Sequence, residues 1–487
     1  MADTLDLSTV LIDPACAVKL PAAFALRRLV LPLSVVDGKF AVAMADPDDA
    51  PTRELVKREV GLDVVAYRVE TARLREELLK LYGENRAAPS VGITGTTDDP
   101  VALVDHLLRA AALRHASDVH FDPMRTGLRV RFRTDGELED VTVLAPSLQA
   151  SVTSRLKVLA GLDIAERRAP QDGGFTWRMQ GSFRVPPLDV RMATLPVRYG
   201  ERLTLRLLET DGERLTLDRL GFSSADQTAF ENVLAQPHGL VLLTGPTGSG
   251  KTTTLYAAIH LLLQRRALNV LTVEDPIEYE IPGVSQAEVD SADKVNFTKA
   301  LRALLRHDPD VIMIGEIRDA ESLDTAVKAA LTGHLVLSTL HTNDAIGAVT
   351  RLKDMGLAPH LAAATLRLSV AQRLVRALCP HCRRARPLAA AEAAVFGRPA
   401  DAGQTVYAPA GCLRCAGRGY RGRVGLFELF MPDRACASQI AADAPETELY
   451  AWAHAHGMKT LADDAWAKCV AGVTTVDEAA RTIGGGF

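Results

Sequence analysis

A stretch near the middle of the chain constrains the fold more than any other feature of the sequence. Residues 245–252 read GPTGSGKT and fit the spacing G-x-x-x-x-G-K-[ST]. Glycines let successive backbone N–H groups converge on phosphate oxygens, because no Cβ stands in the way. An apolar run at 240–243 precedes the loop and an amphipathic pattern follows it, which indicates strand, loop and helix rather than an ordinary glycine-rich turn. The motif therefore predicts an α/β fold that binds a nucleotide phosphate.

Each part of this loop has an expected task. The helix that begins near Lys251 adds the partial positive charge of its N-terminus to the site. The Lys251 ammonium is expected to reach the β- and γ-phosphates of ATP, and the Thr252 hydroxyl to hold Mg²⁺. The predicted nucleotide-binding residues are Gly245, Pro246, Thr247, Gly248, Ser249, Gly250, Lys251, Thr252 and Thr253.

Two short apolar runs elsewhere in the chain end in carboxylates. The run 311–314 leads to Glu316, and the run 270–273 leads to Glu274 and Asp275. In open α/β sheets, ligands bind beyond the carboxyl ends of the strands. Either glutamate is suited to orient the water that attacks a phosphate, and the sequence leaves the choice between Glu316 and Glu274 open. The alternative for each is a surface acid that merely follows a strand.

A histidine follows another run of this kind. Residues 335–338 lead to His341, at the same expected edge of the sheet, where an imidazole can sense the γ-phosphate. A lone histidine at a strand end is more often a structural residue. A functional interpretation is favoured only because this histidine is expected to lie beside the glycine loop and the two glutamates.

Composition and charge exclude several other classes of protein. The 487 residues are 47% hydrophobic and 24% charged, which are ordinary globular values, so extended disorder and fibrous repeats are excluded. With 56 Lys and Arg against 60 Asp and Glu, the net charge of −4 gives no overall basic surface for nucleic acid. No run reaches the roughly 18 apolar residues of a membrane helix, and the acidic start lacks a secretory signal. We expect a cytoplasmic protein that meets a membrane only through a partner.

The cysteines point to a metal. Seven are present, and four of them form two C-x-x-C pairs. A cytoplasmic chain keeps its thiols reduced, so metal binding is favoured over disulfides. Four thiolates are the tetrahedral ligand set of structural zinc, whereas redox thiols or cysteines without a function are the alternatives. The predicted zinc ligands are Cys379, Cys382, Cys412 and Cys415.

The first part of the chain divides into two α+β units. In residues 1–84, strand-like runs flank a turn at Asp37-Gly38, and two helical patterns follow. The stretch 85–99 is rich in Gly, Thr, Asp and Pro and is typical of a linker. In residues 100–210, strict alternation at 128–133 predicts a half-buried strand. Its three arginines are interpreted as a solvated face in preference to a basic surface for an anion.

Several strings, in this order with the glycine loop, resemble the secretion ATPase superfamily, which drives bacterial type II secretion and type IV pilus assembly. They are ASDVHFDP at 116–123, RVRFRTDGEL at 129–138, ERRAPQDG at 166–173 and DVRMATLPVRYGERLTLRLL at 189–208. The cysteine pairs followed by GRGYRGRVG at 417–425 resemble the metal-binding insert of that family. The resemblance is specific over residues 100–430 and looser over residues 1–84.

The resemblance implies a fold and a domain order. A RecA-like P-loop NTPase core is joined to a PAS-like α+β domain, a small N-terminal docking domain and a zinc-binding insert. The implied ranges are 1–84 for the docking domain, 85–99 for the linker, 100–210 for the PAS-like domain, 220–375 for the ATPase core, 376–430 for the tetracysteine module and 431–487 for a C-terminal helical region.

The resemblance also implies a mode of action. Family members hydrolyse ATP as homo-hexameric rings, with ATP between subunits, and deliver motion to an inner-membrane platform. Residues 1–84 resemble the domain that docks this platform, so the protein is expected to associate with the membrane peripherally and without insertion. Arg191 and Arg206 match arginines that the PAS-like domain points at the nucleotide phosphates.

Further roles follow in the same way. Glu274 and the acid after it correspond to the aspartate box of the family, Glu316 to its Walker B acid, and His334 and His341 to its histidine box. The expected cofactors are ATP, Mg²⁺ and Zn²⁺. The long cyclic-dinucleotide-binding pattern of the family is not found in residues 1–84, so that ligand is not predicted.

Type II secretion is the favoured function, and type IV pilus assembly is the alternative. Pilus-retraction motors generally lack the cysteine insert and a long N-terminal region, and this chain has both. A nucleic-acid motor is disfavoured by the strings in residues 100–210 and by the net charge of −4. A nucleotide-gated scaffold without catalysis would lack a catalytic acid, whereas the candidate acids are present.

Overall fold

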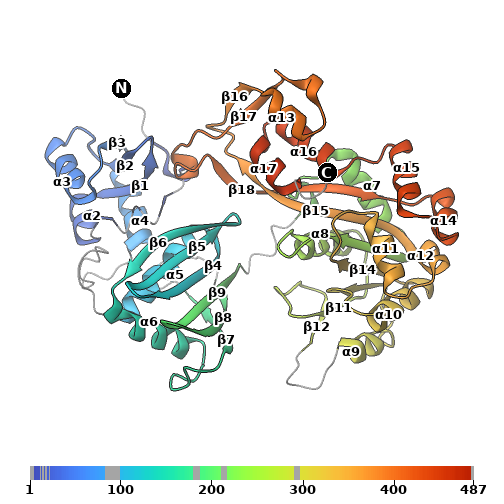
Figure 1. Ribbon diagram of the computed structural model, residues 1–487. Helices are drawn as coiled ribbons and strands as arrows, with labels where there is room; N and C mark the ends of the chain where they lie inside the picture. Colours follow the sequence, from blue (N-terminus) through green and yellow to red (C-terminus); the bar gives the residue numbers. More distant parts are fainter. Residues whose placement is uncertain are drawn as a thin grey trace. The chain divides into compact units, whose positions relative to one another are not determined.

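The computed structural model describes residues 5–10, 12–13, 16, 19–20, 22–82, 99–178, 187–209, 216–289 and 297–483. Most of the predicted linker at 85–99 lies outside these residues. The chain divides into two compact units, which are described separately (Figure 1). Unit 1 comprises residues 1–211, 378–384 and 408–422, and unit 2 comprises residues 212–377, 385–407 and 423–487.

Unit 1 begins with a small α+β domain. Its sheet has the order β1-β2-β3, with β1 (Val30–Val36), β2 (Lys39–Met44) and β3 (Val64–Arg68). A short 3-10 turn, η1 (Leu7–Thr9), and three helices accompany the sheet: α2 (Ala22–Arg28), α3 (Ala50–Val60) and α4 (Thr71–Tyr82). The strands that flank the Asp37-Gly38 turn pair antiparallel, whereas β3 pairs parallel with β2.

A second sheet domain of unit 1 spans residues 99–209. Its six strands have the order β6-β5-β4-β9-β8-β7, and helices α5 and α6 pack on one face (Figure 1). Asp99 caps α5 by accepting a hydrogen bond from the Val101 N–H. The elements are α5 (Pro100–Leu113), β4 (Ala116–Met124), β5 (Gly127–Thr134), β6 (Glu137–Leu144), α6 (Pro146–Leu159), β7 (Gln171–Trp177), β8 (Leu188–Val197) and β9 (Gly200–Glu209).

The alternating arginines of β5 lie on the face of this sheet that is turned away from the helices. Leu128, Val130 and Phe132 are fully buried, which sets the intervening residues on the opposite face. There the Arg131 guanidinium lies 2.7 Å from the Asp122 carboxylate, and its side chain is only 20% exposed. The interpretation of these arginines as a solvated face is therefore wrong for Arg131, because a cross-strand carboxylate partners it.

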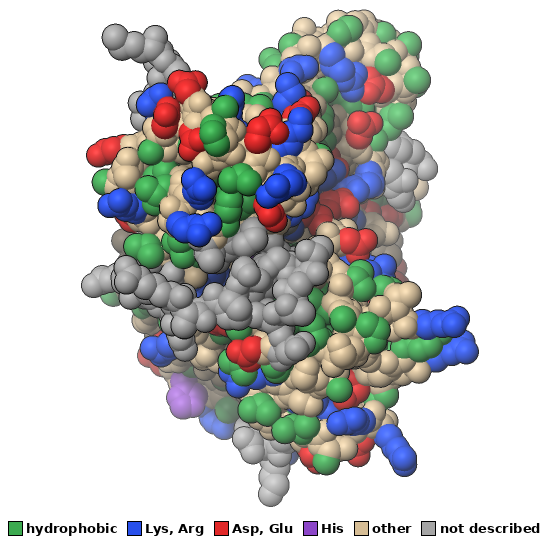
Figure 2. Space-filling model, turned by 90° about the vertical axis from the view of Figure 1, so that its left-hand side faces the viewer, with side chains coloured by type: hydrophobic (Ala, Val, Ile, Leu, Met, Phe, Trp, Pro, Cys, Tyr) green, Lys and Arg blue, Asp and Glu red, His purple; other side chains and the backbone are tan. Residues whose placement is uncertain are grey.

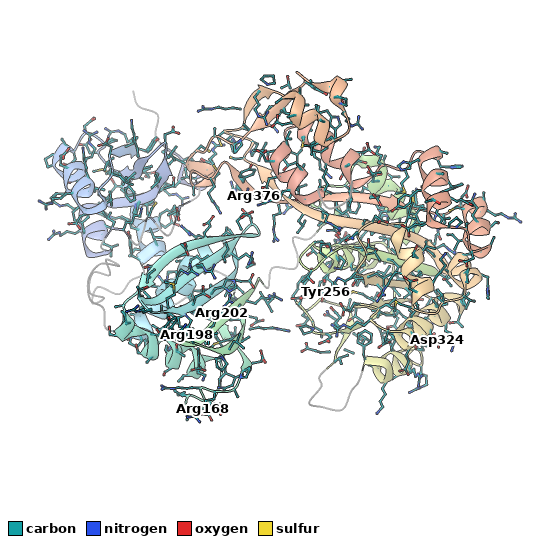
Figure 3. All side chains as sticks on the ribbon, in the orientation of Figure 1. Arg168, Arg198, Arg202, Tyr256, Asp324 and Arg376 are labelled. Atoms are coloured by element: carbon teal, nitrogen blue, oxygen red, sulfur yellow. The ribbon has the colours of Figure 1, made fainter. Side chains whose placement is uncertain are left out.

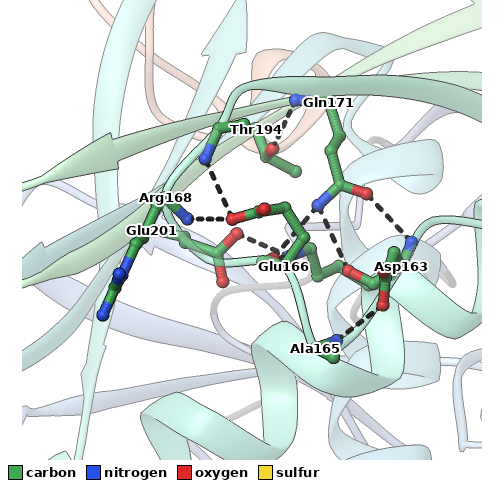
Figure 4. A network of polar contacts seen from close by, with 9 residues as sticks. Asp163, Ala165, Glu166, Arg168, Gln171, Thr194 and Glu201 are labelled. Carbon is green, nitrogen blue, oxygen red and sulfur yellow. Dashed lines mark hydrogen bonds and ion pairs between the residues drawn. The ribbon is translucent and has the colours of Figure 1, made fainter.

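The first part of the string at 166–173 belongs to a loop before β7, which a polar network with a buried ion pair holds in place (Figure 4). Lys157 of α6 is 1% exposed, and its Nζ donates to Glu201 Oε1 at 2.6 Å and to the Glu166 carbonyl at 2.5 Å. The Gln171 amide donates to the carbonyls of Asp163 and Glu166, both at 3.1 Å. The ion pair and the amide together fix the path of the chain between α6 and β7.

Unit 2 is built on a seven-stranded sheet with the order β12-β11-β13-β14-β10-β15-β18. From β12 to β15 in this order, each strand pairs parallel with the next. The central strands are buried on both faces, as covered parallel strands are. The strands are β10 (Gly239–Thr244), β11 (Val270–Glu274), β12 (Ser285–Glu288), β13 (Val311–Ile314), β14 (Leu335–Leu340), β15 (Leu366–Leu378) and β18 (Tyr420–Phe430).

Helices cover both faces of this sheet. Leu242 of β10 packs into one hydrophobic cluster with α10 and α12, and Leu243 into another with α7 and α8. The predicted α/β class is thereby confirmed. The elements are η3 (Leu217–Arg219), α7 (Ser224–Leu234), α8 (Lys251–Arg265), α9 (Phe297–Leu304), α10 (Ala320–Leu331), α11 (Gly347–Asp354) and α12 (Pro359–Thr365).

The cysteine-bearing region is more regular than its loop-rich sequence suggests. Strand β15 continues to Leu378, β18 begins at Tyr420, and β16 and β17 form a two-stranded sheet. The further elements are β16 (Arg384–Pro387), α13 (Ala390–Val395), η4 (Pro399–Asp401), β17 (Thr405–Ala408), η5 (Leu413–Cys415), α14 (Arg434–Ala441), α15 (Glu446–Ala455), α16 (Leu461–Val470) and α17 (Val476–Ile483).

Charged side chains of both signs are intermixed on the face shown in Figure 2. This agrees with the near balance of 56 Lys and Arg against 60 Asp and Glu. A face of this kind produces no strong field of one sign that would attract a polyanion. Among the helices of the described residues, none combines the length and the apolar character needed to cross a membrane.

Candidate nucleotide-binding and metal sites

The glycine loop lies between β10 and α8, as its sequence predicts. Gly245, Gly248 and Gly250 have φ of 144°, 80° and 88°, a region that side chains with a Cβ rarely adopt. A Cβ on Gly245 would lie 2.5 Å from the Gln372 carbonyl oxygen. These glycines are therefore required by backbone conformation and by the close approach of β15.

Polar groups converge inside this loop. Lys251 is 9% exposed, and its Nζ donates to the carbonyls of Gly245 at 2.8 Å and Pro246 at 3.1 Å. Burial, and then the positive charge of Arg373, lowers the pKa of Lys251 to about 8. The buried Ser249 hydroxyl has no hydrogen-bond partner among the described residues. An ammonium, an unpartnered hydroxyl and the N-terminus of α8 together suit a phosphate group.

The two candidate acids lie at the same edge of the sheet but in different surroundings. Glu274 ends β11, is 2% exposed, and accepts hydrogen bonds from Thr272 Oγ1 at 2.7 Å and Gln286 Nε2 at 3.1 Å. Tyr256 of α8, labelled in Figure 3, donates a third hydrogen bond to it. Burial, and next the Glu274 carboxylate, raises the pKa of Tyr256, which keeps the phenol a donor. The Glu274 carboxylate is thus occupied by three donors.

Glu316 is more accessible. It follows β13, its side chain is 24% exposed, and its Oε2 lies 3.3 Å from Nε2 of His341, which follows β14. Arg318 also contacts the Glu316 carboxylate. Burial, followed by the nearby Lys251 ammonium, lowers the pKa of His341, so this imidazole is neutral near pH 7. The structure brings together Glu316, His341 and Lys251.

The structure separates the two histidines of the implied histidine box. His341 follows the carboxyl end of β14, whereas His334 precedes its first residue, Leu335. The His334 Nδ1 lies 2.9 Å from the carbonyl of Ala329 in α10. His334 therefore does not join His341 beside the glycine loop.

Three residues of this site were not predicted, because no sequence motif marks them as functional. Tyr256 looks like a core residue of α8, although it contacts Glu274. Gln372 of β15 accepts a hydrogen bond from Thr254 at 2.8 Å, and Arg373 donates to the carbonyl of Asn343 at 2.8 Å. The positions of Gln372 and Arg373 follow from the pairing of β10 with β15, which brings together residues more than a hundred positions apart in the chain.

The remaining predicted residues lie in unit 1. Arg191 of β8 and Arg206 of β9 stand directly opposite each other in the antiparallel register. Residues that face each other across such a pair share one face of the sheet, and like charges there are unfavourable. A bound anion between the two guanidinium groups would relieve this repulsion.

The four cysteines of the two pairs come together in unit 1, with all four Sγ atoms within 4.8 Å of one another. The Sγ distances Cys379–Cys412, Cys382–Cys415 and Cys412–Cys415 are each 3.8 Å. A tetrahedron of zinc–sulfur bonds of about 2.3 Å requires the sulfur atoms to be about 3.8 Å apart. The backbone N–H groups of Cys412 and Gly419 each lie 3.2 Å from the Cys415 sulfur, as donors to a thiolate. The cluster therefore fits a zinc ion.

Comparison with known proteins agrees with this geometry. Residues 96–481 match the model of the type II/IV secretion system protein family, and residues 2–88 match that of the MshEN domain. Type II secretion system protein E of Pseudomonas aeruginosa is 46% identical over 381 residues, which cover 78% of this chain and 75% of that protein. Type II secretion system ATPase E of Vibrio cholerae is 42% identical over 381 residues, with 78% of this chain and 75% of that protein covered.

Solved structures resemble the chain as well. The pilus retraction motor PilT with bound ADP has 26% identity and a TM-score of 0.52, with 77% of this chain and 95% of that chain covered. The ATPase DotB of Legionella pneumophila shares the fold, with a TM-score of 0.58 at 22% identity, and covers 79% of this chain and 96% of its own. The matches confirm the resemblance drawn from the sequence strings, and the chain belongs to the type II/IV secretion system protein family, as an ATPase.

Proposed function

We propose that the chain hydrolyses ATP to power type II protein secretion. The observation that carries this proposal is the glycine loop, with Lys251 and Glu316 at one sheet edge, in a chain 42–46% identical to type II secretion proteins. The pilus retraction motor is more distant, at 26% identity, so type II secretion is favoured over pilus retraction, and pilus assembly remains the alternative. The protein works as a homo-hexamer in the cytoplasm and docks an inner-membrane platform through residues 1–84.

The glycine loop binds the triphosphate. Backbone N–H groups of residues 247–250 and the Lys251 ammonium hold the phosphate oxygens, and the Ser249 hydroxyl gains an acceptor there. Thr252 is the residue that holds Mg²⁺, which neutralises charge on the phosphates when it is bound. Hydrolysis of ATP requires mostly positioning and charge stabilisation, so these contacts supply much of the catalysis.

Glu316 orients the attacking water. The Glu316 side chain is 24% exposed and its carboxylate contacts His341 and Arg318, whereas Glu274 is 2% exposed and its carboxylate accepts three hydrogen bonds. His341, neutral near pH 7, contacts Glu316 and senses the γ-phosphate. Glu274 then has a supporting role, in which it fixes Tyr256 and the loop that follows β11.

Arg191 and Arg206 supply positive charge to the departing γ-phosphate. Arg191 and Arg206 belong to unit 1, whereas the glycine loop belongs to unit 2. Their direct opposition across β8 and β9 supports this role, because it creates a place for an anion. Cys379, Cys382, Cys412 and Cys415 hold a structural zinc ion outside the reaction.

Substitution of the loop lysine tests the central assignment. Lys251→Ala is expected to abolish ATP turnover, because the variant loses the ammonium that holds the phosphates. The fold is expected to persist, as judged by circular dichroism and melting temperature. Thr228→Ala, on the exposed side of α7, is the matched control and is expected to keep wild-type turnover. Unchanged turnover of Lys251→Ala would refute the proposal.

A further inference from the structure

A row of four charged side chains crosses the sheet of residues 99–209. Arg133 of β5 stands opposite Asp118 of β4, Asp118 stands opposite Arg206 of β9, and Arg206 stands opposite Arg191 of β8. All four share the face that is turned away from α5 and α6, because Val119 and Leu205, their neighbours in the strands, are fully buried. Asp118 is the only carboxylate of this row.

Asp118 contacts Arg133 at 3.8 Å and Arg206, and it is itself fixed, whereas Arg206 is exposed. The Asp118 side chain is 12% exposed, and its Oδ2 accepts a hydrogen bond from Ser117 Oγ at 2.8 Å. Its Oδ1 lies 3.3 Å from Nε of Arg206, whose side chain is 60% exposed. The contact is made by Nε, the guanidinium nitrogen bonded to the side-chain stem, so the two terminal nitrogens are left to bind a ligand.

We infer that Asp118 is a positioning residue that holds the Arg206 guanidinium in the orientation that the γ-phosphate requires. The inference rests on the role proposed above for Arg206. A long exposed arginine samples many rotamers, and a fixed carboxylate at its Nε removes part of that freedom before the transition state forms. The carboxylate also offsets the repulsion between Arg206 and its neighbours Arg133 and Arg191 in the row.

A double-mutant cycle separates positioning from a general structural role. Asp118→Ala is expected to lower kcat by about 10²-fold with little change in KM, because a misplaced group acts mainly in the transition state. In an Arg206→Ala background the same substitution is expected to change kcat by no more than about twofold, because its target is gone. Asp118→Asn, which keeps the shape and one acceptor, is expected to lose less kcat and covers the case in which the alanine variant fails to fold.

Asp122 provides the matched control. It lies on the same face of β4, its side chain is 14% exposed, and it contacts Arg131 at 2.7 Å and Arg202 at 3.1 Å (Arg202 is labelled in Figure 3). Asp122→Ala removes the same charge from the same face without touching Arg206. It is expected to lower the melting temperature as much as Asp118→Ala does, while kcat stays within about twofold of wild type.

The outcomes distinguish the inference from the function on which it rests. If Arg206→Ala is inactive while both Asp118 variants turn over ATP like wild type, the inference is wrong and the role of Arg206 stands. The inference is also wrong if Asp118→Ala lowers kcat by the same factor in the Arg206→Ala background as in the wild type. If Arg206→Ala itself is fully active, the proposed role of Arg206 is wrong, and the inference about Asp118 is refuted with it.

Discussion

The buried ion pair of Lys157 and Glu201 allows a quantitative test of what stabilises the sheet domain. Lys157 is 1% exposed and Glu201 is 7% exposed, with 2.6 Å between the charged atoms. Lys157→Met keeps most of the apolar stem but leaves the Glu201 carboxylate buried without its partner. Breaking such a pair costs about 3–5 kcal/mol. Because the hydrogen bond to the Glu166 carbonyl is lost as well, we expect the upper part of this range.

Native-state hydrogen exchange is the appropriate assay, because a chain of several domains does not unfold in two states. Amides of β8 and β9 are expected to exchange about 3 × 10³-fold faster in Lys157→Met, the equivalent of about 4.7 kcal/mol. Amides of β10, in the other unit, serve as the internal control and are expected to be unchanged.

A second variant tests the reason for the loss. Lys157→Met combined with Glu201→Leu removes both charges, and replacement of a whole buried pair by apolar groups is often neutral. The double variant is therefore expected to recover most of the protection in β8 and β9. The reasoning would be refuted if these amides exchanged less than about tenfold faster in Lys157→Met than in wild type. It would also be refuted if they exchanged as fast in the double variant as in Lys157→Met.

Four further predictions concern the two sites. Glu316→Gln is expected to lower kcat by about 10²–10⁴-fold with ATP binding retained. Glu274→Gln is expected to lower the melting temperature, because an amide N–H₂ would face groups that donate to the carboxylate. Its loss in kcat is expected to be smaller than that of Glu316→Gln. A larger loss in kcat from Glu274→Gln would assign the orientation of the water to Glu274. Chelation of zinc is expected to raise hydrogen exchange around the four cysteines, and unaltered exchange would argue against a structural metal. The Lys251 pKa of about 8 predicts ATP affinity about tenfold weaker at pH 9 than at pH 7, as the ammonium loses its proton; in fluorescent-nucleotide titrations, a flat profile would contradict this.

The parts of the site that are contiguous in sequence were predictable. The glycine loop needs only a preceding strand and a following helix, and Glu316 and His341 follow short apolar runs whose parallel pairing brings their carboxyl ends together. The contacts of Glu274 were not predictable, because Tyr256 reaches it from α8 and Gln286 from β12. No local pattern reports which distant side chains will surround a buried carboxylate.

The same distinction holds for the folds of the domains. Strand β5 was predictable from its strict alternation, whereas β7 was not, because Gly173 and Gly174 lower the strand propensity of its sequence. Its pairing with β8 supplies the backbone hydrogen bonds that its composition does not suggest. The pairing of Asp118 with Arg206 likewise depends on strand register, which the sequence does not display.

The antiparallel register of β8 and β9 limits how this part of the chain can be re-engineered. Side chains along a strand point alternately to the two faces, so the insertion of one residue into β9 before Leu205 would turn Arg206 into the core and Leu205 out of it. An insertion within a strand keeps the later side chains on their original faces only if it adds an even number of residues. Insertions of any length must otherwise be confined to the hairpin between Val197 and Gly200. A library of length variants should therefore tolerate additions at that hairpin and reject odd-numbered ones within the strands.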